Sequence, residues 1–328
     1  MSESLIHAAA ERLERRVSPT TPIRSDVNVS FEFFPPASPG GRDSLTKSAE
    51  ELRMFSPKFV SVTYGAGGSS QEKTLLSLDR LGDLGGLSIA GHLTCVAAGK
   101  DDVQGVIDTY RQRGVTRIVA LRGDAPGDAQ GCAPDGSHPD GYRSAAELVE
   151  GIRSRPDGDD FDISVAAYPE VHPKATSAQA DLDNLKAKID AGADRAITQF
   201  FFDTDTFLRF LDRARANGIT APIVPGIMPI TNFAGVSRFS ERCGTEVPEW
   251  MQDLFAGLDD APEVRDLVAA TVAAEQCKKL LEHGVSDFHF YTMNKPNLTA
   301  ATCRILGIVP AIDVRRSAVA PEAKASAS

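Results

Sequence analysis

Short runs of β-branched, aromatic and small apolar residues alternate along the chain with longer segments in which apolar residues recur at helical spacing. The short runs predict strands at Asn28–Phe34, Phe59–Thr63, Ser88–Leu93, Arg117–Leu121, Asp162–Tyr168, Arg195–Phe202, Pro222–Ile227 and Asp287–Tyr291. The longer segments predict helices at Asp43–Met54, Gln71–Gly82, Asp101–Arg113, Ser144–Arg153, Ser177–Ala191, Thr204–Ala216, Phe233–Cys243 and Pro262–His283. This alternation favours an α/β fold of the (β/α)8 TIM-barrel type. A doubly wound parallel sheet uses the same units and is the alternative.

The barrel is expected to occupy residues 27–312. Residues 1–26 predict an N-terminal helix that closes the barrel floor or contacts another subunit, because apolar residues recur there at Leu5, Ile6, Ala9 and Leu13. Residues 313–328 are small, polar and rich in Ala and Ser, which predicts a disordered tail. The segment Asp124–Gly141 is rich in Gly, Asp and Pro, and so long an irregular stretch inside a compact domain is usually functional.

The charge of the chain argues against nucleic acid as a partner. Among 328 residues there are 45 acidic and 35 basic side chains, for a net charge of −10 at pH 7. Such a chain is poorly suited to broad contact with a phosphate backbone. No apolar run approaches the roughly 18 residues that span a bilayer, and the acidic start does not look like a signal peptide. We therefore expect no membrane partner and a cytoplasmic location.

The cysteines and histidines give no metal-binding pattern. The six histidines lack HExxH spacing, and no CxxC pair occurs among the five cysteines, which are Cys95, Cys132, Cys243, Cys277 and Cys303. This usage is typical of a reducing cytosol and predicts neither a disulfide framework nor a metal site.

Alternation along the strands indicates which side chains enter the barrel. In the first strand the apolar set is expected to face the surrounding helices, namely Val29, Phe31 and Phe33. Glu32 then lies in the barrel mouth, at the end of the strand where barrels of this kind carry their active sites. By the same reasoning the last strand turns two polar rings inward, His289 and Tyr291.

Glu32 is the sharpest candidate for chemistry. Its neighbours Phe33, Phe34, Pro35 and Pro36 predict poor hydration, which would raise the pKa of the carboxyl and let it act as an acid near neutral pH. The alternative is a carboxylate that pairs with a basic group of a neighbouring strand.

Two loops after predicted strands could hold an anion. Arg122 can make paired bonds to a phosphate, and Gly123 permits close backbone approach to a ligand; the alternative is a surface ion pair between Arg122 and Asp124. The Gly-rich loop at Tyr64–Ser70 could offer backbone amides to an anion, but it matches no phosphate-binding fingerprint.

Other polar residues have an ordinary structural interpretation beside the functional one. His92 and His172 could each donate a hydrogen bond to a ligand. A lone histidine is more often a structural residue whose hydrogen bonds are made within the protein. Asp181 and Lys188 share one face of a predicted helix, which usually means a solvated face. Phe239 is most simply a packing residue.

Taken together, the motifs at the strand ends resemble the methylenetetrahydrofolate reductase family. They cover about residues 27–307 in family order: SFEFFPP from Ser30, FVSVTYG from Phe59, HLTC from His92, ALRGD from Ala120, SVAAYPEVH from Ser164, ITQFFFD from Ile197, PGIMP from Pro225 and FHFY from Phe288. The resemblance is to the bacterial type, which consists of the catalytic domain only.

The resemblance implies an FAD-dependent enzyme that reduces 5,10-methylenetetrahydrofolate to 5-methyltetrahydrofolate and feeds methionine synthesis. The electron donor is NAD(P)H, with NADH favoured, although no Rossmann fingerprint in the sequence distinguishes the two. The family works by a ping-pong mechanism in which hydride passes through flavin N5. It also implies a homo-oligomer.

The resemblance also implies residue roles. Glu32 is the general acid, and Asp124 tunes the flavin and the folate electrostatically. The implied FAD contacts are Thr63, Tyr64, Ala66, His92, Arg122, Gly123, Asp124, Tyr142, Arg143, Tyr168, His172, Ala175, Asp181, Asn184 and Lys188. The implied substrate contacts are Glu32, Thr63, Asp124, Gln199, Phe239, Tyr291 and Lys295.

The chain departs from the bacterial pattern at two basic positions. Lys295 stands where that pattern has an arginine, so the planar bidentate fork is lost. Ala187 replaces a basic residue, which leaves Lys188 to meet the flavin phosphates. Two other functions stay open at this stage: a flavin barrel oxidising another substrate, in the manner of proline dehydrogenase, and a folate- or flavin-binding protein without turnover.

Overall fold

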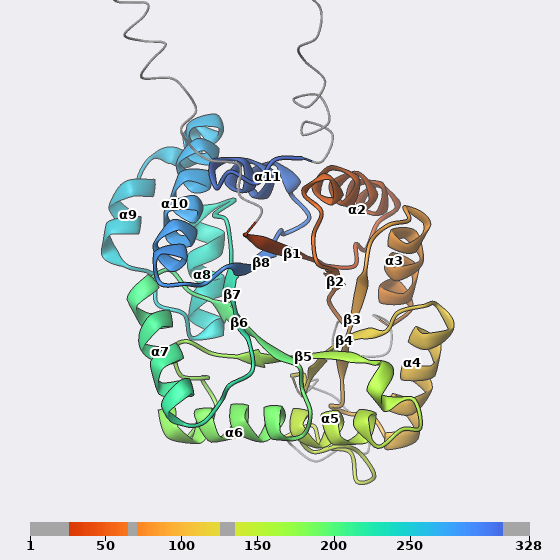
Figure 1. Ribbon diagram of the computed structural model, residues 1–328. Helices are drawn as coiled ribbons and strands as arrows, with labels where there is room; N and C mark the ends of the chain where they lie inside the picture. The colour runs from red at the N-terminus through yellow and green to blue at the C-terminus, as the bar shows by residue number, and fades with distance from the viewer. Residues whose placement is uncertain (1–25, 65–70, 125–134, 311–328) are drawn as a thin grey trace, which may run out of the picture.

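A computed structural model describes residues 26–64, 71–124 and 135–310. Eight parallel strands form a closed barrel in chain order, and helices surround it (Figure 1). The strands are β1 Asn28–Phe33, β2 Val60–Val62, β3 Ile89–Thr94, β4 Arg117–Leu121, β5 Asp162–Ala167, β6 Arg195–Phe200, β7 Ile223–Ile227 and β8 Asp287–Tyr291. Because β1 pairs with β8, the sheet has no edge. The predicted TIM barrel is confirmed, and the doubly wound alternative is excluded.

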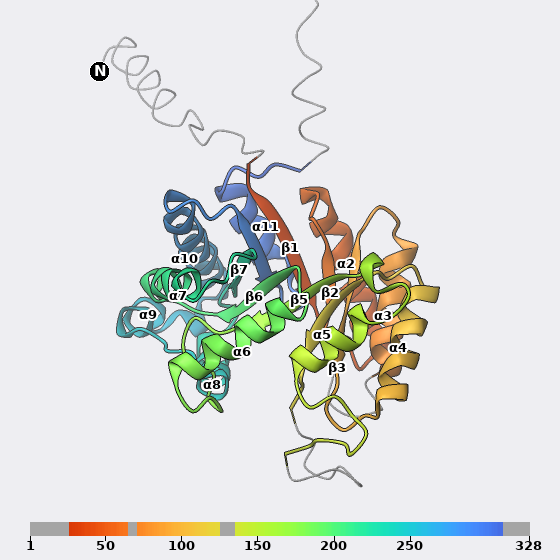
Figure 2. The same cartoon turned by 60° about the horizontal axis from the view of Figure 1, so that its bottom comes forward.

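Ten helices lie in the described part of the chain. They are α2 Pro39–Leu52, α3 Gln71–Asp83, α4 Lys100–Gln112, α5 Ala145–Arg153, α6 Ala178–Asp190, α7 Thr204–Ala216, α8 Phe233–Cys243, α9 Glu249–Phe255, α10 Pro262–Glu282 and α11 Pro296–Ile305. Several begin where a side chain caps the first turn; for example, Ser144 and Ser177 accept hydrogen bonds from the amides three residues on. Figure 2 shows α5 and α6 covering the outside of the barrel.

Two helices, α9 and α11, were not predicted. The first has only seven residues, and the second begins at Pro296 directly after the turn that follows β8. A short helix shows little periodicity, so its existence depends on packing more than on pattern. The α11 helix packs against α10 and α2, which closes the ring of helices across the junction of β1 and β8 (Figure 1).

The core lies in two layers. Strand residues that face outward, such as Phe31 and Phe290, are fully buried against the helices, as alternation predicts. Inward-facing residues form a small separate cluster inside the barrel: Phe59, Ala90, Val119, Ile197 and Val224. This inner cluster fills only part of the interior, and the layer toward the strand ends is polar.

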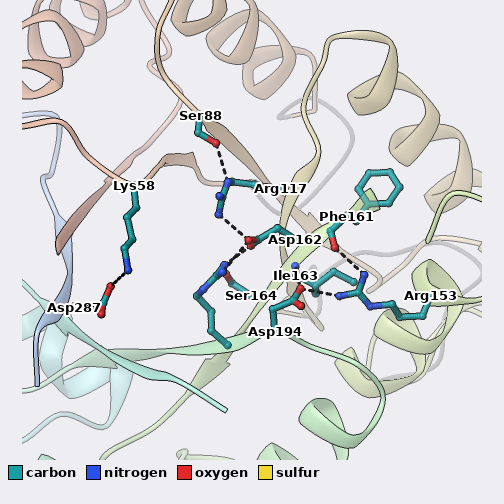
Figure 3. Close-up of polar contacts among 11 residues, drawn as sticks. Lys58, Ser88, Arg117, Arg153, Phe161, Asp162, Ile163, Ser164, Asp194 and Asp287 are labelled. Atoms are coloured by element: carbon teal, nitrogen blue, oxygen red, sulfur yellow. Dashed lines mark hydrogen bonds and ion pairs between the residues drawn. The ribbon is translucent and has the colours of Figure 1, made fainter. Parts of the chain in front are cut away.

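Ion pairs join the strand beginnings at the floor of the barrel, as Figure 3 shows. Arg117, Asp162 and Arg195 are the first residues of three adjacent strands, β4, β5 and β6. The Asp162 carboxylate accepts from both guanidinium groups, at 2.8 Å from Arg117 Nη1 and 2.8 Å from Arg195 Nη2. Lys58 pairs with Asp287 at the same end. This end of a TIM barrel serves stability, and the opposite end is free for chemistry.

Several expectations fall outside the described residues. They are the N-terminal helix before Asp26, the tail beyond Pro310, most of the 124–141 loop, Cys132 and Ala66. Of the cysteines that are described, all four are free thiols. No helix in the described ranges has the length and apolarity needed to cross a membrane.

Candidate active site

Two adjoining cavities open at the carboxyl ends of the strands. The barrel-mouth cavity, of about 520 Å³, has a wall that includes Glu32, Thr63, Tyr64, His92, Asp124, Tyr168, Gln199, Phe239 and Tyr291. The outer cavity, of about 510 Å³, has a wall that includes Arg122, Gly123, Asp124, Tyr168, His172, Ala175, Asp181, Asn184 and Lys188. Asp124 and Tyr168 belong to both walls. The structure therefore brings most of the predicted site residues into one continuous region.

Glu32 lies between two histidines at the end of β1. Its Oε2 atom is 3.2 Å from His92 Nε2 of β3 and 3.5 Å from His289 Nε2 of β8. The contact with His289 has the geometry of a hydrogen bond, whereas the contact with His92 has the distance of an ion pair without hydrogen-bond angles. The side chain is only 17% exposed, so solvent screens these contacts weakly.

The expected rise in the pKa of Glu32 is wrong. Burial is the largest single influence and does raise the pKa, but the neighbouring imidazoles of His92 and His289 together outweigh it and lower the pKa to about 2. The alternative interpretation, a carboxylate paired with a basic group of a neighbouring strand, therefore describes the protein at rest. Periodicity placed Glu32 in the mouth, but it could not show which imidazoles the barrel closure brings beside it.

His289 contacts Glu32, whereas the sequence predicted only that its ring faces into the barrel. Its ring is fully buried, with Nδ1 at 2.8 Å from Ser30 Oγ, and lies stacked 5.7 Å from the ring of Phe59. The sequence feature that could have identified His289 as a site residue is its position on the inward face of β8. Its partners depend on the register of β1 against β8, which sets Ser30 opposite His289 and Glu32 opposite Tyr291.

The turn between β8 and α11 holds the end of β1. Thr292 Oγ1 donates to the carbonyl oxygen of Glu32 at 2.6 Å, and the Asn294 side chain bonds both the N–H and the C=O of Phe34. Met293 and Asn294 both have left-handed backbone conformations, with φ of 52° and 53°. Two such residues in succession are uncommon and cluster at functional sites. The backbone that carries Glu32 is thus fixed by side chains from the other end of the chain.

Aromatic and amide groups form the opposite wall of the barrel-mouth cavity. Tyr291 donates its hydroxyl to Thr198 O at 2.7 Å, and burial raises its pKa well above the usual range. Phe239 stacks on Phe200 with ring centroids 5.5 Å apart, so one of its faces packs while it still lines the cavity. Gln199 Oε1 accepts from the N–H of Phe200, and its amide nitrogen is the donor left to meet a ligand.

Lys188 is buried in the outer cavity. Its side chain is among the buried charged groups of the protein, and Nζ donates to Ala166 O at 2.6 Å. Burial lowers its pKa to about 8, against the opposing charge of Asp181. The expected solvated face is therefore wrong for this residue. A cation held in such a place costs free energy that a bound anion would offset.

His172 and Asp181 are fixed to one another through the backbone. The N–H of His172 donates to Asp181 Oδ2 at 3.0 Å, and the N–H of Lys174 donates to His172 Nδ1 at 3.0 Å. Because Nδ1 accepts, the proton of the neutral ring is on Nε2. The ring of Tyr168 meets that of His172 edge-on at 4.4 Å.

The Leu121–Asp124 turn lines the outer cavity, and the alternative ion pair between Arg122 and Asp124 does not form. Arg122 lines the outer cavity, yet its Nη2 also donates to the carbonyl oxygen of Asp135 at 2.6 Å; its acidic partner is Asp135, not Asp124. The Asp124 side chain is 92% exposed and lies 3.5 Å from Lys174 Nζ. Gly123 has φ of +87°, and a Cβ there would meet Val96 Cγ1 at 2.7 Å. Glycine is required at this position.

Three predicted contacts lie elsewhere among the described residues. Tyr142 is buried, its hydroxyl accepting from Gln104 Nε2 at 2.8 Å, and Arg143 is an exposed residue just before α5. Lys295 is exposed at the beginning of α11. None of the three is part of either cavity wall.

The structure adds two lining residues that were not predicted. Phe34 and Met293 line the barrel mouth and are 41% and 40% exposed. No group of His, Cys, Asp and Glu able to hold a metal ion occurs in the described ranges.

The fold and the two cavities define a barrel protein with a carboxylate held between two imidazoles in its mouth and a cationic extension beside it. A family model for methylenetetrahydrofolate reductase matches residues 19–307. The chain is 47% identical over 294 residues to the 5,10-methylenetetrahydrofolate reductase of Pectobacterium carotovorum subsp. carotovorum, covering 90% of this chain and 94% of that protein. It is 46% identical over 290 residues to the enzyme of Escherichia coli (strain K12), covering 88% and 94%. The chain belongs to the methylenetetrahydrofolate reductase family.

Two more distant proteins extend the comparison. Methylenetetrahydrofolate reductase (NADH) 1 of Arabidopsis thaliana is 37% identical over 298 residues, covering 88% of this chain and 50% of that protein. A solved structure of an uncharacterized protein from Clostridium thermocellum, which binds two copies of 5-methyl-5,6,7,8-tetrahydrofolic acid, has a TM-score of 0.57 at 14% identity, covering 85% and 95%. That likeness is one of fold. The resemblance seen in the sequence is confirmed, and the chain is an oxidoreductase of the methylenetetrahydrofolate reductase type.

Proposed function

We propose that this enzyme reduces 5,10-methylenetetrahydrofolate to 5-methyltetrahydrofolate with FAD as its cofactor and NADH as its electron donor. It does so in the cytoplasm, as a homo-oligomer, and its product feeds methionine synthesis. The observation that carries the proposal is the shared wall of the two cavities. Asp124 and Tyr168 join a mouth that holds a buried acid to an extension that holds a buried cation.

The outer cavity fits the diphosphate of a dinucleotide. Lys188 is a buried ammonium group whose cost of burial a phosphate would offset, and Arg122 and Lys174 add positive charge to the same wall. Gly123 lets the ligand approach the backbone closely. When bound, FAD supplies the redox centre that takes up hydride from the donor and gives it to the folate.

The barrel-mouth cavity suits one flat substrate at a time. The aromatic ring of Phe239, which stacks on Phe200 and contacts the Arg242 guanidinium, lines this wall, and Gln199 offers an amide donor beside it. A single volume of about 520 Å³ supports the ping-pong order, in which nicotinamide leaves before folate enters. The name of the Arabidopsis thaliana relative supports NADH as the donor.

Glu32 supplies the proton that opens the five-membered ring of the folate. Protonation of the ring nitrogen turns it into a leaving group, and the positive charge that then develops is stabilised by the carboxylate of Asp124. Closure of the mouth by a bound substrate removes water from Glu32, which favours its neutral, proton-bearing form.

An anaerobic titration tests the proposal. NADH should bleach the flavin absorbance near ~450 nm, and 5,10-methylenetetrahydrofolate should then restore it. Flavin bleaching by NADH without recovery on adding 5,10-methylenetetrahydrofolate would indicate that the enzyme reduces another substrate. A purified protein that binds no flavin in either redox state would exclude FAD as the cofactor.

A further inference from the structure

His289 lies behind Glu32 and outside the cavity wall. The described residues that line the barrel mouth include His92, whereas the His289 ring is fully buried between Phe59 and Tyr291. A ligand in the mouth can therefore contact His92 directly but reaches His289 only through Glu32. The two imidazoles touch the same carboxylate oxygen, yet only one of them is shielded from ligands.

The second ring nitrogen of His289 faces a hydroxyl that can act in two ways. Ser30 Oγ is 2.8 Å from His289 Nδ1 and 3.4 Å from the carbonyl oxygen of Phe288. The hydroxyl can donate to Nδ1 when that nitrogen carries no proton. It can also accept from Nδ1–H while donating to Phe288 O. In the second arrangement Ser30 accepts from Nδ1–H both in the doubly protonated ring and in a neutral ring that keeps its proton on Nδ1, so the Nδ1 proton stays in place when Nε2 loses its own.

We infer that His289 stores the proton that Glu32 donates to the folate, and that Ser30 stabilises the doubly protonated ring. The inference rests on the proposed function, and it makes His289 a positioning residue that acts through Glu32. The ion pair between an imidazolium and a carboxylate is the resting state. It explains why a carboxylate so poorly exposed is ionised before the substrate arrives.

The proton balance of the step is simple. The N–H bond at His289 Nε2 breaks as an O–H bond forms at Glu32 Oε2, and that proton then passes to the ring nitrogen of the folate. His289 is left neutral with its remaining proton on Nδ1, donated to Ser30 Oγ. After the product leaves, solvent protonates Glu32 through the open mouth, and the proton returns to Nε2. One proton is consumed per folate reduced: it ends on the ring nitrogen that departs when the ring opens, and the hydride then reduces the iminium without a further proton.

The ionisable groups that act on Glu32 are His92 of β3 and His289 of β8, and Glu32 in turn raises the pKa of Tyr291 of β8. On the other side of His289 lies Phe59, whose ring contacts the guanidinium groups of Arg117 and Arg195. Burial keeps Tyr291 protonated. The proton therefore has two alternative sites besides Glu32, namely His289 and His92, and among the described residues only His289 has a side-chain hydrogen bond at its second nitrogen, to Ser30.

Variants of His289 and Ser30 test the inference in the FAD-loaded enzyme. In His289→Gln, the folate half-reaction should slow by about 10²-fold, while flavin reduction by NADH stays within about twofold. Ser30→Ala should slow the folate half-reaction by about tenfold, and Ser30→Thr, which keeps the hydroxyl, should restore it. Ser77→Ala is the matched control, because Ser77 is equally buried but donates within its own helix to Lys73 O. Retained NADH reduction shows that each variant is folded.

A second measurement reports the proton itself and needs no turnover. In the protein with ¹⁵N-labelled histidine and no substrate, NMR should show His289 protonated on both nitrogens at neutral pH, and Glu32→Gln should remove the second proton. A singly protonated His289 in the parent protein, or an unchanged folate half-reaction in His289→Gln, would overturn the inference. If the parent reduces no folate at all, the proposed function fails, whereas the NMR result still decides where the proton lies.

Discussion

Glu32 and His289 stand on neighbouring strands of the closed barrel, with Glu32 Oε2 at 3.5 Å from His289 Nε2. They are 257 residues apart in the chain, and they meet because β1 pairs with β8. The pairing places an acid and a buried imidazole where barrel enzymes carry their chemistry. Loss of barrel closure would separate them, so the stability of the fold and the competence of the acid are linked.

Replacing the acid should separate the two half-reactions. Glu32→Gln removes the proton donor but leaves the outer cavity intact. We expect NADH to reduce the flavin at close to the parental rate, and folate reduction to slow by about 10²–10⁴-fold. Stopped-flow absorbance measures each half-reaction separately. Glu150→Gln, at an exposed position on α5, is the control and should change neither rate. If Glu32→Gln reduced folate at the parental rate, the assigned role would be refuted.

The Glu32 carboxylate should also make the free energy of unfolding depend on pH in the acidic range. Its pKa is about 2 in the folded protein against 4.5 as its ordinary value, so the folded state favours the ionised form. The contribution is fully present above pH 4.5 and is lost as the pH falls from 4.5 towards 2. Urea unfolding at a series of pH values should show a shallower decline over that window for Glu32→Gln than for the parent. Parallel curves would show that the two histidines do not stabilise the carboxylate.

The affinity for FAD should depend on pH through Lys188. In the free protein burial lowers its pKa to about 8, and a bound diphosphate would raise it again. Below pH 8 the ammonium form exists with or without ligand, so the affinity is flat. Above pH 8 binding must take up a proton, so the affinity should fall by up to about tenfold per pH unit. Fluorescence titration of apoprotein with FAD measures this.

Two lysine variants on α6 test whether the pH dependence of FAD binding comes from Lys188 itself or from any lost positive charge. Lys188→Met should weaken FAD binding and abolish the fall above pH 8. Lys186→Met, which removes an exposed ammonium paired with Asp190, should leave both the affinity and its pH dependence close to parental. A fall above pH 8 that persists in Lys188→Met would assign the titration to another group.

A methyl group at Gly123 should disturb the turn after β4. The φ of +87° is unfavourable for alanine, and the added Cβ would clash with Val96 and Thr94. We expect Gly123→Ala to lower the free energy of unfolding by about 1–3 kcal/mol and to weaken FAD binding. Gly105→Ala is the matched control, because this helical position has open space around it. That variant should be neutral or more stable by up to about 1 kcal/mol. Thermal unfolding with and without FAD compares the two.

The floor of the barrel should affect stability without affecting chemistry. Asp162→Asn leaves Arg117 and Arg195 without their shared carboxylate (Figure 3). Because the three side chains are 21–28% exposed, we expect a loss of about 2 kcal/mol, less than for a fully buried pair. Both half-reactions should keep their parental rates in the folded variant. A large change in the folate half-reaction would mean that the two ends of the barrel are coupled.

Much of the architecture is readable from the chain alone, because hydrophobic periodicity acts over a few neighbouring residues. The alternation in Asn28–Phe33 placed Phe31 outward and Glu32 inward, and both positions are as predicted. The helices α9 and α11 escaped prediction, because a short segment carries too few apolar repeats to distinguish it from a loop.

The identity of the site depended on motifs, and its electrostatics depended on contacts. Residues 30–36 and seven further motifs pointed to the methylenetetrahydrofolate reductase family before any contact was known. The lowered pKa of Glu32 and the burial of Lys188 required the tertiary structure, because each follows from groups that the fold brings together from distant segments. A pattern of neighbours along the chain determines which face a side chain takes. The charges that surround the Glu32 side chain and its exposure to solvent are decided only by the tertiary structure, in which β8 pairs with β1.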